Sequence, residues 1–332
     1  MTTIRPRTLL SIQYLRGIAA LVVVAAHMPW FKCAVGAVGV DVFFVISSFI
    51  MANVSRRETT PRAFLTARAL RVVPLYWVMT AVEMVAQGEY FDGRVLASLL
   101  FIPTLDQNDW FMPIVGQGWT LTYEMFFYAC FGVGLTLSLS RRLPILTLAF
   151  VIFCVVQAVL DPSAFATRGI SAAPLMEFLF GIWLHRAWQA EQLPNTTACV
   201  AVAAASLLVF LYTWSEVLPP WRVIVWGLPA VAIVAAGLAV ERGGRLPSSR
   251  ILLMLGNASY ALYLVHPLVQ QVLKPVVKPL PLPVALAVLL VACVLAGLAV
   301  HRLVERPMAA WLARKVYGAN RNGALERVPA KR

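Results

Sequence analysis

Charged residues are scarce in this chain, and no long polar segment separates its apolar stretches. Asp, Glu, Lys and Arg together make up 13% of the 332 residues, whereas hydrophobic residues make up 60%. The mean hydropathy of +0.77 corresponds to more apolar surface than one soluble core could bury. The composition therefore excludes a soluble two-domain protein and predicts one integral membrane domain.

Acidic residues are the scarcer of the two charge types. The chain has 15 Asp and Glu against 28 Lys and Arg, and its formal net charge is +13. A nucleic-acid-binding protein gathers its basic residues in one polar region, but here they are dispersed between apolar segments. We therefore expect membrane lipids as partners and no nucleic acid, and the sequence predicts no particular oligomeric state.

Cysteine motifs and a signal-peptide cleavage site are also missing. The five cysteines show no CxxC or CxxH spacing and mostly lie inside apolar runs, so we expect neither a metal site nor a disulfide framework. The first apolar segment has no small-residue cleavage site after it and carries Arg16 and His27. It is expected to be a retained membrane span.

Apolar windows predict an all-α polytopic membrane protein of about ten transmembrane helices around an intramembrane polar cavity. The predicted spans are residues 9–28, 35–53, 72–87, 118–139, 143–160, 172–188, 198–214, 222–240, 251–272 and 282–303. The stretch 95–103 is too short to cross a bilayer and is expected to be interfacial or re-entrant. Residues 1–312 are expected to form a single membrane domain, and residues 313–332 a basic, flexible cytoplasmic tail.

Basic residues are distributed unequally between the two sides of this topology. If the N-terminus is cytoplasmic, most arginines fall in inner segments, and the outer segments hold only Lys32, Arg94, Arg168, Arg222, Lys274 and Lys278. The positive-inside rule predicts this asymmetry. An even number of spans places both termini in the cytoplasm.

Ionisable residues inside the spans cost several kcal/mol on insertion scales, so each needs a partner, a wet cavity or a function. Arg16 and His27 are eleven residues apart, which places them on nearly the same helix face about 16 Å apart. Folding the hairpin after His27 brings Asp41 to the same depth, where a carboxylate would orient the imidazole as a general base. The alternative is a structural polar contact between the two spans.

The remaining ionisable groups separate by depth. Glu124, Glu177 and His266 lie in the outer halves of their spans, and the inner side holds Arg16, Arg68 and Arg71. An anionic donor would then enter among the inner arginines, and a hydroxyl-bearing acceptor would approach from outside. For Glu177 we expect structural pairing, and topology setting with lipid contact is the alternative role of the Arg68–Arg71 pair.

Aromatic and polar residues near the outer boundary have two readings. The ninth span places Ser259, Tyr263 and His266 within a few turns of each other, followed by Pro267, which frees a backbone carbonyl. A further set of aromatic residues fits either an interfacial belt or a sugar-stacking platform. Its members are Trp110, Trp119, Tyr123 and Trp221.

Several blocks of this sequence, in this order, resemble the acyltransferase 3 family of bacterial integral membrane proteins, in particular its exopolysaccharide-acetylating branch. The blocks are YLRGIAALVVVAAH, VGVDVFFVISSFIM, FLTARALRVVPLYW, GWTLTYEMFFY, NASYALYLVHP and HRLVERP. The resemblance extends from residue 11 to residue 307. It implies transfer of an acyl group, usually acetyl from cytoplasmic acetyl-CoA, to a hydroxyl of an envelope glycan or lipid-linked saccharide in the bacterial inner membrane.

The resemblance also implies roles for single residues. His27 and Arg16 would be the essential pair, supported by Asp41 and Glu124, while Arg68 and Arg71 would lie near the CoA. Candidate acceptor-binding residues are Trp119, Tyr123, Tyr263 and His266. Two features depart from the family pattern: Ser47-Ser48-Phe49 stands where Ser-Gly-Phe is usual, and no hydrolase-like C-terminal domain follows, so the membrane unit is expected to act alone.

The mechanism expected from these residues is general-base catalysis by His27, with acyl-CoA as a co-substrate and no permanently bound cofactor. Transient acylation of the imidazole is an alternative. A proton-coupled transporter or flippase is the rival function, because intramembrane His, Asp and Glu also carry protons. That rival predicts inverted repeats and paired broken helices, and the sequence shows neither.

Overall fold

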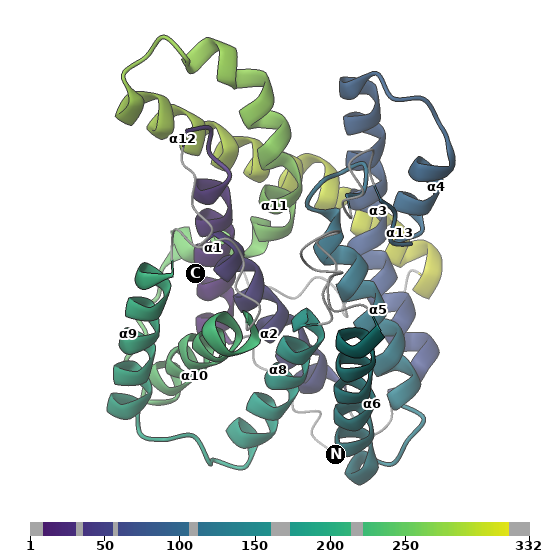
Figure 1. Ribbon diagram of the computed structural model, residues 1–332, viewed down its shortest axis with the longest axis vertical. Coiled ribbons are helices and arrows are strands. Elements are labelled where there is room, and N and C mark those ends of the chain that lie inside the picture. The colour runs from purple at the N-terminus through teal and green to yellow at the C-terminus, as the bar shows by residue number, and fades with distance from the viewer. Residues whose placement is uncertain are drawn as a thin grey trace.

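The computed structural model describes residues 9–30, 36–55, 59–105, 112–160, 173–213 and 222–318, and helices dominate throughout these ranges (Figure 1). In chain order the helices are α1 (Leu10–Ala26), α2 (Gly36–Val54), α3 (Pro61–Gln87), α4 (Gly93–Leu99), α5 (Gly118–Gly134), α6 (Leu139–Leu160), α8 (Ala173–Gln189), α9 (Thr196–Tyr212), the π-helical turn η1 (Val223–Gly227), α10 (Leu228–Arg242), α11 (Arg250–Val277), α12 (Leu282–Val300), the π-helical turn η2 (His301–Glu305) and α13 (Arg306–Tyr317).

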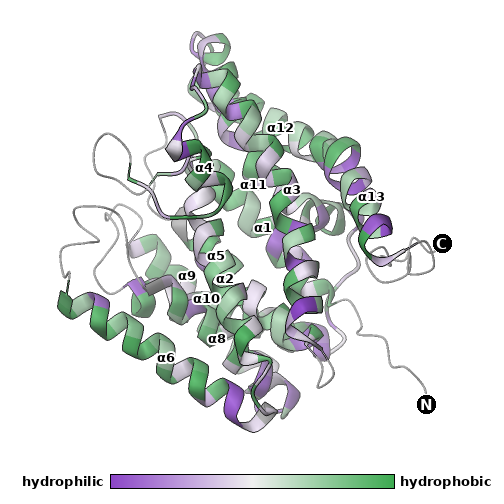
Figure 2. Ribbon diagram, turned by 90° about the vertical axis from the view of Figure 1, so that its right-hand side faces the viewer, coloured by the Kyte–Doolittle hydropathy of each residue, from purple (hydrophilic) through white to green (hydrophobic). Residues whose placement is uncertain are grey.

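The helices are membrane helices by length and composition. Five of them are long and apolar enough to cross a bilayer, and three shorter apolar helices accompany them. Each of the predicted spans overlaps one of the helices, although α3 begins eleven residues before the predicted span 72–87, and the all-α polytopic fold is confirmed. Figure 2 shows hydrophobic residues along most of α6 and hydrophilic residues concentrated on α13.

Helix α1 lies at the centre of the arrangement. It packs against α11, α2 and α10, while α2 packs in turn against α8, and α11 against α12. Figure 1 shows α8, α9 and α10 on one side of this centre and α3, α5 and α6 on the other. This packing places α1, α2, α5 and α11 close enough for their polar side chains to line one cavity.

A carboxylate fixes the first turn of α1. Glu241, at the end of α10, accepts hydrogen bonds from the backbone N–H groups of Leu10 and Ser11 at 2.9 and 2.8 Å and from the Ser11 hydroxyl at 2.6 Å. The first N–H groups of a helix have no partner within the helix and attract negative charge. This contact sets the position of α1, and therefore of Arg16, relative to α10.

Two glycines allow the closest helix crossings. A Cβ at Gly181 in α8 would lie 2.0 Å from the Ser48 Oγ and 2.2 Å from the Val45 carbonyl oxygen in α2. The family pattern places a glycine at position 48, but in this chain the glycine of the partner helix provides the close approach. In the same way, a Cβ at Gly256 in α11 would lie 2.1 Å from the Gln13 carbonyl oxygen in α1.

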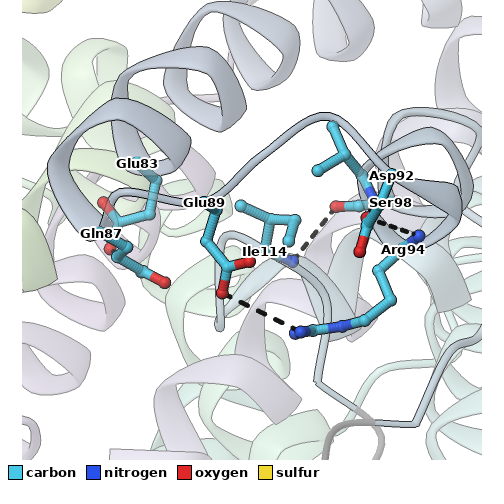
Figure 3. A network of polar contacts seen from close by, with 8 residues as sticks. Glu83, Gln87, Glu89, Asp92, Arg94, Ser98 and Ile114 are labelled. Atoms are coloured by element: carbon cyan, nitrogen blue, oxygen red, sulfur yellow. Dashed lines mark hydrogen bonds and ion pairs between the residues drawn. The ribbon is translucent and has the colours of Figure 1, made fainter.

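The segment after α3 forms a polar rim, shown in Figure 3. Asp92 caps α4 by accepting from the N–H groups of Arg94 and Val95, and Arg94 lies 3.9 Å from Glu89. The Ser98 hydroxyl accepts from the Ile114 N–H at 3.3 Å. The stretch 95–103, expected to be interfacial, is thus the short helix α4 followed by non-helical chain.

The C-terminal helix extends further than the sequence indicated. The span expected to end at residue 303 continues through η2 into α13, which ends at Tyr317. The first residues of the expected flexible tail are therefore helical. Residues 319–332 of that tail lie outside the described residues.

Candidate active site

A cavity of about 680 Å³ lies between α1, α2, α3, α5, α11, η2 and α13. Five arginines line it: Arg16, Arg68, Arg71, Arg306 and Arg314. Its acidic lining residues are Glu124 and Glu305. The cavity is therefore positively charged, as the binding site of an anionic molecule would be.

Two of the arginines come from the first half of α3. Thr60 caps this helix by accepting from the Ala63 N–H at 3.2 Å, and Pro61 occupies its first turn. Arg68 and Arg71 follow three residues apart and both line the cavity, as neighbours on one helix face do. The Arg68 Nε is buried and has no hydrogen-bond partner, so this side chain has an unused donor beside the cavity.

Arg16 enters the cavity from α1. Its Nη2 donates to the Ser259 hydroxyl of α11 at 3.0 Å, and its Nη1 to the Gln13 side-chain oxygen at 3.4 Å. The close crossing of α1 and α11 at Gly256 makes the first contact possible, because the two helix backbones approach each other there. Ser259 therefore acts with Arg16 rather than with His266.

Glu124 lies at the deep end of the cavity, where two hydroxyl groups fix its side chain. Ser47 of α2 and Tyr128, one turn further along α5, both donate to the Glu124 Oε1 at 2.5 Å. Hydrogen bonds from hydroxyl groups to a carboxylate are short and strong. Neither Ser47 nor Tyr128 was an expected site residue. The i, i+4 spacing of Glu124 and Tyr128 does predict that these two side chains are neighbours on one helix face.

A layer of hydroxyl and ring contacts bounds the cavity next to Glu124. The Tyr263 hydroxyl lies 2.8 Å from the Thr120 Oγ1 and donates to the Gln117 carbonyl at 3.1 Å. The Tyr263 ring contacts the rings of Phe43 and His266, at centroid distances of 6.2 and 6.1 Å. Tyr263 therefore lines the arginine-lined cavity and also contacts His266.

His27 and His266 form a pair beyond this layer. Their ring centroids are 5.2 Å apart in an edge-on arrangement. The Nδ1 of His27 lies 2.8 Å from the Val23 carbonyl oxygen, and the Nδ1 of His266 lies 2.9 Å from the Tyr263 carbonyl oxygen. A carbonyl can only accept, so each Nδ1 carries a hydrogen, and the Nε2 is the atom of each ring that can exchange a proton with a substrate. The Nε2 of His266 is buried without a partner.

The expected pairing of Asp41 with His27 is wrong. Both the Nε and the Nη2 of Arg222 donate to the Asp41 Oδ1, at 2.9 and 2.6 Å, and Glu177 lies 3.5 Å from the same guanidinium. Asp41, Glu177 and Arg222 are all buried. A permanently charged guanidinium compensates a buried carboxylate better than a neutral imidazole does. The orienting group of His27 is instead its own helix backbone, at Val23.

Glu177 has the structural pairing that was expected for it. Its partner is Arg222, which was not among the expected site residues. Arg222 was counted among the outer loop charges because it begins a predicted span. In the structure its guanidinium also lies 5.9 Å from the ring centroid of Trp119 and 5.6 Å from that of Trp226. The signal for this interaction was the position of Arg222 at the edge of an apolar segment.

The four candidate acceptor-binding residues do not line one common site. Trp119 is next to Arg222, and its ring contacts that of Tyr123 at 6.0 Å. Of the four candidates, only Tyr263 lines the cavity. Trp110 and Trp221 lie outside the described residues. A sugar-stacking role for these aromatic residues stays a prediction.

The cavity thus brings together five of the predicted residues from four helices. These are Arg16, Arg68, Arg71, Glu124 and Tyr263. His27 and His266 lie together beyond the Tyr263 layer, and Asp41 belongs to the separate Arg222 cluster. Arginines that can hold an anion and histidines that can accept a proton therefore lie on two sides of one aromatic layer.

Comparison with known proteins identifies the family of this chain. The family model described as "Acyltransferase domain" matches residues 9–302. The chain is 32% identical to the exopolysaccharide production protein ExoZ of Rhizobium meliloti (strain 1021) over 297 residues, which cover 86% of this chain and 93% of ExoZ. No solved structure matches it.

Two further relatives carry names of acyl-transferring proteins. The acyltransferase MdmB of Streptomyces mycarofaciens is 26% identical over 311 residues, which cover 78% of each chain. The peptidoglycan O-acetyltransferase OatA of Listeria monocytogenes is 30% identical over 95 residues, which cover 27% of this chain and 15% of OatA. The match over nearly the whole described membrane unit shows that this chain belongs to the acyltransferase 3 family of integral membrane acyltransferases.

Proposed function

We propose that this protein is an O-acyltransferase of the bacterial inner membrane. It moves an acyl group, in the first place acetyl, from cytoplasmic acyl-CoA to a hydroxyl of an exopolysaccharide or another envelope glycan. The single observation that carries this proposal is the separation of five cavity arginines from a pair of histidines by the Tyr263 layer. The names of ExoZ and OatA support a polysaccharide acceptor and an acetyl group.

The cavity arginines hold the donor. Phosphate oxygens bind guanidinium groups strongly and with defined geometry, and Arg68 offers a buried Nε without a partner. The CoA nucleotide would lie between α3 and α13, and its acyl-bearing arm would extend past Glu124 towards Tyr263. Holding the thioester close to the acceptor supplies much of the rate by removing the entropy cost of encounter.

His27 is the general base. Its Nδ1–H is held by the Val23 carbonyl, so the Nε2 lone pair is free to remove the proton of the acceptor hydroxyl. The hydroxyl oxygen then forms a bond to the thioester carbonyl carbon, and the carbon–sulfur bond breaks. The imidazolium returns its proton to the departing CoA thiolate, so protons balance over the cycle. His27 is exposed at the end of α1, where a bulky glycan can reach it.

The orientation of the chain follows from the same assignment. The cavity arginines of α3 and α13 are assigned to the cytoplasmic side by the positive-inside rule. The donor then enters from the compartment that contains acyl-CoA, and the His27 end of α1 faces outwards.

The first test is acyl transfer from radiolabelled acetyl-CoA into envelope glycan by membranes containing the native protein or His27→Ala, at matched expression. General-base assistance is worth about 10²- to 10⁴-fold, so incorporation is expected to fall by that factor. His185→Ala is the control, because His185 is buried against Phe49 and Trp188 outside the cavity. Equal incorporation by native protein and His27→Ala would refute the role of His27, and no incorporation with any common acyl-CoA would refute the function.

A further inference from the structure

One face of α13 forms a wall of the arginine-lined cavity. The α13 residues that line it are Arg306, Ala309, Ala310, Ala313 and Arg314. Their spacing of i, i+3, i+4, i+7 and i+8 defines a single face of an α-helix. Such a face is usually apolar and packs into a core, but no residue of α13 is buried. The face is therefore open to the cavity, and something other than protein is available to cover it.

The side chains on this face leave room between two charges. The three alanines project only methyl groups, so a flat apolar floor lies between Arg306 and Arg314. Eight residues of helix separate the two arginines by about 12 Å along the helix axis. Both arginines are exposed. The face is shaped for a ligand with a planar or apolar part and more than one anionic group.

The neighbouring wall of the cavity, formed by α3, is also positively charged. Arg68 and Arg71 line the cavity from α3, which α13 contacts, and the Nε of Arg68 is buried without a partner. Glu305, the acidic residue nearest in sequence to α13, is already bonded to the Nδ1 of His301 at 2.6 Å. Within the described part of the chain, no ion pair joins Glu305 to Arg306 or Arg314. The two walls therefore present two separate groups of cations.

We propose that α13 is the nucleotide-binding wall of the donor site, and that Arg306 and Arg314 recognise the ribose 3′-phosphate of acyl-CoA. This inference rests on the proposed function. In acyl-CoA the thioester, the diphosphate and the 3′-phosphorylated adenosine follow one another along the molecule. With the acyl-bearing arm extending past Glu124 to Tyr263, the diphosphate reaches Arg68 and Arg71. The adenosine then lies over the alanines of α13, and the 3′-phosphate meets its exposed arginines.

The test compares acetyl-CoA with 3′-dephospho-acetyl-CoA as donors. The proteins are the native chain, the double variant Arg306→Gln/Arg314→Gln and the control Lys315→Gln, all in nanodiscs of uncharged lipid. Lys315 lies on the same helix, but its Nζ is over the Trp311 ring at 4.4 Å and it does not line the cavity. The control removes one positive charge from α13 without altering the proposed site.

We expect the double variant to raise the KM for acetyl-CoA about 10- to 100-fold, the loss expected for hydrogen bonds to a charged group. Its kcat at saturating donor and its KM for the dephospho donor should equal those of the native protein and of Lys315→Gln. Unchanged discrimination between the two donors in the double variant would overturn the inference, as would an equal rise in KM in Lys315→Gln.

Two other outcomes have distinct meanings. If the α13 arginines bind anionic lipid headgroups instead, the double variant will match the native protein in uncharged lipid and differ only when anionic lipid is added, which overturns the inference alone. If the native protein transfers label from neither donor, the proposed function fails, and the inference fails with it.

Discussion

Asp41 pairs with a guanidinium because a buried carboxylate needs a partner that keeps its charge. The side chains of Asp41 and Arg222 are 0% and 5% exposed, and Glu177, also 0% exposed, shares the same guanidinium. A neutral histidine could not compensate two carboxylates in such surroundings. The role of this cluster is therefore to hold α2, α8 and the start of η1 together beside the active site.

Replacing Arg222 with Met should destabilise the protein. Two buried carboxylates would lose their counter-ion, and breaking a buried ion pair in this way costs about 3–5 kcal/mol. The measurement is thermal unfolding in detergent. Arg94→Met is the control, because Arg94 forms a partly exposed pair with Glu89 at 3.9 Å, and exposed pairs contribute about 0–1 kcal/mol. Equal unfolding midpoints for the two variants would show that the cluster is not structural.

Ser47 should matter for activity through Glu124. In Ser47→Ala the Glu124 carboxylate keeps only the Tyr128 donor, so its position at the deep end of the cavity is less defined. We expect kcat to fall about tenfold, the loss expected for one hydrogen bond to a charged group. Ser48→Ala is the matched control, since the Ser48 hydroxyl only donates to carbonyls of its own helix. Equal kcat values for the two variants would contradict this role.

Helix crossings decide which side chains meet, and the crossing of α2 and α8 depends on one small residue. Position 48 has a serine where the family pattern has a glycine, and Gly181 supplies the missing space from the other helix. The same helices carry Asp41, Ser47 and Glu177. A shift at this crossing would therefore move both the Arg222 cluster and the partner of Glu124.

Gly181→Ala should destabilise the fold by about 1–3 kcal/mol, the usual cost of overpacking. Ser48→Gly should rescue it only in part, because the added Cβ would still lie 2.2 Å from the Val45 carbonyl oxygen. Gly93→Ala is the control, since a Cβ there meets nothing within 4 Å. Unfolding midpoints in detergent measure all three, and a full rescue by Ser48→Gly would show that the backbone contact does not limit the crossing.

In the whole molecule, the distribution of basic residues and the position of the arginine-lined cavity indicate the same cytoplasmic side. The arginines of α3 and α13 line the cavity, and His27, at the C-terminal end of α1, does not. Because the proposed donor is cytoplasmic, this polarity fixes which end faces which compartment. The proposal therefore makes a statement about topology as well as about chemistry.

Single cysteines in a cysteine-free background test this orientation. A cysteine at Tyr90, which is exposed after α3, should react with a membrane-impermeant thiol reagent added to spheroplasts. A cysteine at Arg245, in the exposed turn between α10 and α11, should react only after the membrane is permeabilised. The positive-inside rule predicts this pattern, and the reverse pattern would place the arginine-lined cavity on the wrong side for cytoplasmic acyl-CoA.

The sequence was sufficient to predict the membrane fold, the approximate helix bounds and four charged residues of the cavity, Arg16, Arg68, Arg71 and Glu124, but not Arg306, Arg314 or Glu305. Hydropathy and helical spacing are properties of a single segment. Local patterns were therefore enough to place Arg16 in α1 and Arg68 and Arg71 in α3. The depth argument also placed Glu124, and the family resemblance implied its supporting role. None of these steps required knowing which helix is next to which.

Only the tertiary structure decided which groups pair. Asp41 and Arg222 are 181 residues apart, and Ser47 and Glu124 are 77 apart, so no local periodicity links them. Depth alone suggested His27 as the partner of Asp41, because depth does not specify the neighbouring helix or the direction of a side chain. The packing of α1 against α11 and of α2 against α8 fixed both, since buried charges take the best counter-ion within reach.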